Sequence, residues 1–187
     1  MNDIPKQVYV NKHIGPLNIN TNTEYKVGSI INQLLKLLAK QENFTIGQNN
    51  TIRRPPAKTI TKIKYNNLND RKFIIAVYQK HSLLVENSIN NINTLIPFAK
   101  EKILDNLNNI YLEALDHFEI DFLDDNYLPN IIENSCEIID FIILKLKSNI
   151  IQSDCSTLFS EDIDLGVQLL VAFSFIECQI LENPNDS

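Results

Sequence analysis

The stretch SEDIDLGVQLLVAFSFIECQIL, residues 160–181, decides the fold. Ser160 followed by two acidic residues is typical of a helix start, because a serine caps the first amides and carboxylates suit the positive end of the dipole. Apolar residues then recur in steps of three and four, which predicts a helix to about Leu181. We expect one face of it, with Phe173, to be buried against other helices. The alternative is that this face is a docking surface covered by a partner.

Four other segments have the same helical period of apolar residues. They span about residues 23–40, 69–92, 97–118 and 130–148, with Asn69 as the expected N-cap of the second. Residues 59–65 alternate in part, so they favour either a strand or a helical turn rich in β-branched residues. Polar composition predicts loops at residues 42–52 and 119–129.

These segments predict an all-α fold of about five helices. Residues 1–22 have short apolar pieces separated by Asn, Gly and Pro and show no helical period, which indicates an extended N-terminal arm. Residues 23–187 would form a single helical domain. The total length of 187 residues suits one domain that folds without disulfides or metals.

The composition argues against several classes of protein. Hydrophobic residues make up 44% and charged residues 21%, as in ordinary globular domains. No run approaches the roughly 18–20 apolar residues of a membrane span, and the N-terminus lacks the pattern of a signal peptide. Cys136, Cys155 and Cys178 stand far apart, outside any Cys/His ligand spacing. We therefore expect a cytoplasmic protein with no membrane segment, no metal and no other cofactor.

Sequence motifs for catalysis are absent. There is no GxxxxGK[ST], GxGxxG or HExxH, and the three histidines are scattered. Asp121, Asp124 and Asp125 lack the glycine and terminal glutamate of an EF-hand loop, so we interpret them as solvated acids. Without a nucleophile, base or metal set that converges, the sequence predicts a protein that is not an enzyme.

The charge is divided between the two parts of the chain. Residues 1–80 carry a net charge of +9 and residues 81–187 a net charge of −15. Three interpretations remain open: the two parts face each other within the fold, one of them meets a partner of opposite charge, or the basic segment binds nucleic acid. The last is disfavoured because the acidic part would repel the same polyanion. Glu177, inside the last apolar stripe, could pair with Lys62, Lys64 or Arg54.

Three segments carry a resemblance to a known family. They are IRRPPAKTI at residues 52–60, KIKYNNL at residues 62–68 and AFSFIECQILENP at residues 172–184. The form K-I-x-Y-N-x-L ahead of a helix and the form F-x-E-C-x-I-x-x-N-P at the end resemble the C-terminal module of bacterial three-component ABC conflict systems. Those systems combine an effector or sensor protein, a small middle component and an ABC/SMC-type ATPase in anti-phage defence.

The resemblance covers nearly the whole chain and implies a function. It implies a non-enzymatic adaptor that docks the ATPase or the middle component, alone or as an oligomer. The family module usually follows an effector domain such as a nuclease, whereas here it starts at Met1, so we expect no toxic activity from this chain. The alternative is a helical immunity or antitoxin protein that binds a cationic partner. The expected contact or core-pairing residues are Arg53, Arg54, Lys62, Lys64, Asn66 and Glu177.

Overall fold

The computed structural model describes residues 28–42 and 55–184. This part of the chain is helical and contains no strand, which confirms the all-α prediction. It holds seven α-helices and one 3₁₀ helix: α1 (Ile30–Glu42), α2 (Ala57–Tyr65), η1 (Leu68–Arg71), α3 (Lys72–Leu95), α4 (Ala99–His117), α5 (Tyr127–Glu133), α6 (Ser135–Gln152) and α7 (Ser160–Ile176). The arm predicted at residues 1–22 lies outside the described residues.

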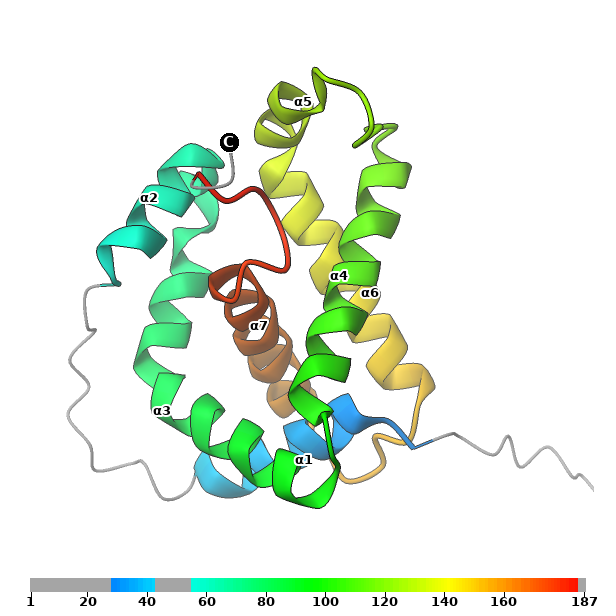
Figure 1. Cartoon of the computed structure of the whole chain (residues 1–187). Coiled ribbons are helices and arrows are strands. Elements are labelled where there is room, and N and C mark those ends of the chain that lie inside the picture. Colours follow the sequence, from blue (N-terminus) through cyan, green and yellow to red (C-terminus); the bar gives the residue numbers. More distant parts are fainter. Residues whose placement is uncertain (1–27, 43–54, 185–187) are drawn as a thin grey trace, which may run out of the picture.

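Helix α7 is the centre of the bundle. It packs against α1, α3, α4 and α6, which surround it (Figure 1). Every residue from Leu169 to Phe175 is buried, so the helix is covered on all sides and not on one face as the sequence predicted. Phe173 is only 4% exposed and stacks with Tyr78, which makes it part of the core and not a docking surface.

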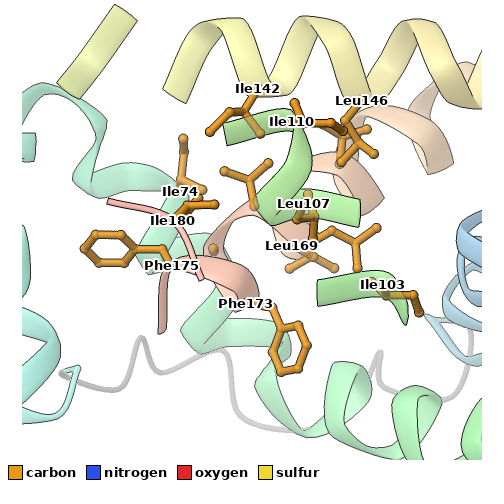
Figure 2. Packing of buried hydrophobic residues seen from close by; sticks show 14 of the residues in the cluster. Ile74, Ile103, Leu107, Ile110, Ile142, Leu146, Leu169, Phe173, Phe175 and Ile180 are labelled. Atoms are coloured by element: carbon orange, nitrogen blue, oxygen red, sulfur yellow. The ribbon is translucent and has the colours of Figure 1, made fainter. Parts of the chain in front are cut away.

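The core around α7 is built from aliphatic side chains of four helices. Figure 2 shows Ile74 of α3, Leu107 of α4 and Leu146 of α6 in one cluster with Leu169 of α7. Helices α1 and α7 approach each other closely at Gly166, where an added Cβ would lie 2.1 Å from Leu35 Cδ2 of α1. A larger residue there would require the Leu35 side chain or α1 to shift.

The structure decides one open prediction and changes another. Residues 59–65 belong to helix α2, which is the helical of the two alternatives, and form no strand. The segment predicted as one helix at 130–148 is two, α5 and α6, which meet at Asn134, and α5 already begins within the predicted loop 119–129. Pro129 stands in the first turn of α5, where a residue without an N–H is tolerated because that N–H would have no helical acceptor.

Several helix ends are shifted from their predicted positions. Helix α1 begins at Ile30, after non-helical Gly28 and Ser29, and not at residue 23. Asn69 lies within η1, so it does not cap α3. The N-cap of α7 is Phe159, whose N–H donates to the Asp162 carboxylate at 3.0 Å, and Ser160 is the first helical residue. Helix α7 ends at Ile176, five residues before the predicted end at Leu181.

Candidate functional site

Lys62 brings helix α2 to the end of the central helix. Its side chain is buried, and its ammonium donates to the carbonyl oxygens of Phe175 at 2.9 Å and Ile180 at 3.1 Å. The same ammonium lies 4.6 Å from the centroid of the Phe175 ring. The last carbonyls of a helix have no partner within the helix and carry partial negative charge. Lys62 thus satisfies a carbonyl at the C-terminus of α7 and a second one in the segment beyond it.

Asn66 holds that segment, residues 177–184, one turn further along α2. Its side chain is fully buried, and its amide nitrogen donates to the Glu182 carbonyl at 2.8 Å and the Lys62 carbonyl at 2.9 Å. Its amide oxygen accepts from the Glu182 N–H at 3.0 Å. The side-chain amide therefore pairs with both backbone groups of Glu182, as a neighbouring β-strand would. This pairing needs both a donor and an acceptor, which asparagine supplies at this length.

The Glu182 side chain is held from the other side by two phenols. The hydroxyls of Tyr111 and Tyr127 each donate to its carboxylate at 3.4 Å. Burial, followed by the charge of Glu182, raises the pKa of Tyr111, and the same charge is the main cause that raises the pKa of Tyr127. Both phenols therefore remain protonated donors at neutral pH.

Glu177 has a different partner from those predicted. Its carboxylate lies 2.8 Å from the Lys100 ammonium of α4, which also lies 5.5 Å from the Phe173 ring centroid. Lys100 belongs to the acidic part of the chain, and among the described residues Glu177 forms its ion pair with Lys100 and not with Lys62 or Lys64. Lys64 is exposed on α2. Arg53 and Arg54 lie outside the described residues.

These contacts form one anchor for the C-terminal segment, which runs from α7 across to α2 (Figure 1). Cys178 and Leu181 in this segment have left-handed backbone angles, with φ of 59° and 57°, which cost roughly 1–2 kcal/mol each for residues other than glycine. Burial of Ile180 and Leu181 and the hydrogen bonds from Lys62 and Asn66 offset that cost. The role that the geometry gives to Lys62 and Asn66 is therefore to hold the chain's own end.

A small cavity adjoins the anchor. It has a volume of about 110 Å³ and is lined by Lys58, Thr59, Lys62, Phe175, Ile176, Cys178 and Asn183. This lining has a thiol and two ammonium groups but neither a histidine nor a carboxylate.

A larger groove lies at the C-terminal end of α4, beside the loop that leads to α5. Its volume is about 330 Å³. Buried Leu115 and Ile120 belong to the core beneath it, while Leu112 and Phe122 are exposed. Three exposed acids also line it: Asp116, Glu119 and Asp121. The sequence showed the acidic run but not the groove; the signal for it was the apolar pair Phe122 and Leu123 among the acids.

The two parts of the chain pair only partly with each other. Among the described residues, the ion pairs Arg71–Asp140 at 2.5 Å and Lys36–Asp154 at 4.0 Å join them. Arg71 donates to both carboxylate oxygens of Asp140 and so ties the start of α3 to α6. The other pairs, Lys100–Glu177, Lys145–Glu113 and Lys147–Asp164, lie within residues 81–187.

The described residues contain no group of three or more His, Cys, Asp or Glu side chains placed to hold a metal ion. None of the helices in residues 28–42 and 55–184 has the length and apolar character that crossing a membrane requires. No protein-family model, no curated protein and no solved structure matches the chain.

Proposed function

We propose that the chain is a non-enzymatic protein-binding module of a bacterial three-component ABC defence system, which docks the ABC/SMC-type ATPase or the middle component. The observation that supports it is the anchor. Lys62 and Asn66 come from the K-I-x-Y-N-x-L segment, and their acceptors at residues 175–182 come from the F-x-E-C-x-I-x-x-N-P segment, more than 100 positions away.

The contact between these two segments gives a physical reason why both occur in one chain. The side chains of the first segment hold the backbone of the second, so each segment needs the other. The resemblance rests on the same two segments in the same order. The polar groups of the anchor are directed at backbone carbonyls and at each other, and not into an open pocket with reacting geometry. They therefore favour a structural scaffold that presents its outer surface to a partner.

The test is copurification with the product of a neighbouring gene. If the chain is this module, an ABC-type ATPase gene lies beside its own, and coexpressed tagged chain retains that ATPase through size-exclusion chromatography. The absence of such a gene, or an ATPase that elutes separately, would contradict the proposal. A salt-dependent gel shift with RNA or DNA would favour the nucleic-acid interpretation instead.

A second candidate is an immunity or antitoxin protein. The acidic groove at the end of α4 favours it, because a cationic toxin surface would meet carboxylates there that form no ion pair with the described residues. A toxin gene directly beside this one, and growth rescue when both are coexpressed, would support this candidate over the adaptor.

A further inference from the structure

The groove at the end of α4 exposes large apolar side chains that the fold does not use. Leu112 is 40% exposed, Phe122 is 56% exposed and Leu123 is 79% exposed. Leu112 of α4 and Phe122 line the groove, and Leu123 follows Phe122 in the loop after α4. That loop lies at one end of the bundle (Figure 1). Single exposed apolar residues are ordinary, but neighbouring ones beside a groove are typical of a protein-binding surface.

The loop that presents these side chains is held in shape by its own hydrogen bonds. The Ile120 N–H donates to the Leu115 carbonyl at 2.9 Å, and the Leu123 N–H donates to the Asp121 carboxylate at 2.9 Å. The Asn126 N–H donates in the same way to Asp124 at 2.9 Å. The backbone around Phe122 is therefore already ordered in the free protein, which lowers the entropy cost of binding a partner.

The charge around the groove identifies the class of partner. Residues 112–125 hold six acids and no lysine or arginine. Of these, Glu113 is paired with Lys145, whereas the groove-lining Asp116, Glu119 and Asp121 have no ion pair with any residue in the described part of the chain. A partner with an apolar side chain flanked by cations would match both the exposed apolar side chains and the acids of the groove. An acidic partner or a nucleic acid would be repelled.

We propose that this groove docks a basic amphipathic helix of a partner protein, with an apolar side chain against Leu112 and Phe122 and cations facing Asp116, Glu119 and Asp121. The inference rests on the proposed function only in that the chain is a protein-binding module. A helix suits the site because lysines or arginines at i±3 and i±4 lie beside an apolar residue and reach both rims of a short groove.

The test uses the full chain and a fluorescent probe peptide of about 14 residues, with leucines at helical spacing and lysines elsewhere. A peptide of the same composition in scrambled order is the probe control. The groove variants are Asp116→Lys with Asp121→Lys, and separately Phe122→Ala. The matched control is Glu101→Lys with Asp105→Lys, two exposed acids at the other end of α4 with the same change in net charge. Thermal melts establish that each variant is folded.

We expect the wild-type chain to bind the helical peptide more tightly than the scrambled one. The groove charge pair should weaken binding by about 30-fold, because each of the two reversals removes an attraction and adds a repulsion. Phe122→Ala should weaken it by about tenfold, and the control pair by no more than about threefold. Binding by the wild type with this ranking supports the groove as the site.

Three results would overturn the inference. The first is no binding by the wild-type chain, and the second is equal loss in the control pair, which would mean attraction by the whole acidic surface. The third is self-association through the groove, seen as a concentration-dependent mass that Asp121→Lys abolishes. The ATPase test remains separate: a groove variant that still retains the ATPase contradicts this site but not the adaptor role, and peptide binding without any ATPase partner contradicts only the adaptor role.

Discussion

The anchor makes a sharp prediction for the substitution Asn66→Asp. The change keeps the size of the side chain but replaces the amide N–H₂ with an oxygen. The Glu182 carbonyl loses its donor, whereas the Lys62 carbonyl still accepts from the backbone N–H of Asn66 at 3.0 Å, and a negative charge then faces both carbonyls. A buried polar group left without a partner costs about 1–3 kcal/mol. The Glu182 carbonyl and the new buried carboxylate oxygen are two such groups and imply a loss of about 3–4 kcal/mol, a large part of the ~5–15 kcal/mol that stabilises a domain.

The neighbouring residue supplies the control for this prediction. Asn67 is exposed and has a left-handed backbone with φ of 50°, which aspartate also tolerates. Asn67→Asp makes the same chemical change and should alter the free energy of unfolding by less than about 0.5 kcal/mol. Urea unfolding monitored by circular dichroism measures both free energies, and in thermal melts the Asn66 variant should unfold about 10 °C lower than wild type. Equal stability of the two variants would refute the role that we give to Asn66.

The pH dependence of the Asn66→Asp variant shows how much of the lost stability comes from the buried negative charge and how much from other effects of the substitution. Burial beside two carbonyls raises the pKa of the new carboxyl in the folded state above its unfolded value of about 4. A group with a raised folded pKa contributes stability below the unfolded pKa and loses it as the pH rises through the folded pKa. The deficit relative to wild type should therefore shrink from pH 7 to pH 5, where the protonated carboxyl can donate to Glu182 again. A deficit that grows at lower pH would contradict this account.

Three other predictions concern the core. Phe173→Ala should cost roughly 3–5 kcal/mol and give a poorly soluble or partly unfolded protein, since Phe173 is buried against Tyr78; a soluble variant with an unchanged midpoint in urea would place it outside the core. Gly166→Ala should cost about 1–3 kcal/mol through its clash with Leu35, and a double-mutant cycle with Leu35→Ala should show favourable coupling, whereas additive losses would mean that the helices do not touch there. Burial raises the pKa of Tyr78 to about 12, so the native state should lose about 2–3 kcal/mol as the pH rises from about 10 to 12, measured by phenolate absorbance and unfolding together; a Tyr78→Phe variant with the same alkaline loss would assign it to another group.

The sequence by itself determined that the domain is helical and that the helix over residues 160–176 buries an apolar face. Both follow from local patterns. Apolar residues that recur every three to four positions lie on one face of an α-helix, and a helix with almost no charge between Ile163 and Ile176 must be covered by other parts of the protein. The same reasoning placed Phe173 in the core. It also located the acidic run at residues 113–125, because charge is read directly from residue type.

Only the tertiary structure decided where α7 ends and what Lys62 and Asn66 do. The apolar period continues to Ile180, yet the helix ends at Ile176, because Lys62 takes carbonyls at Phe175 and Ile180 and Asn66 pairs with the backbone of Glu182. These partners are more than 100 residues away in the chain, and helix propensity depends only on residues that are close in sequence. The same reason applies to residues 57–65, whose β-branched residues fit either a strand or a helix. In the structure Thr59, Lys62 and Ile63 are buried along one side of this segment, and this burial selects the helix.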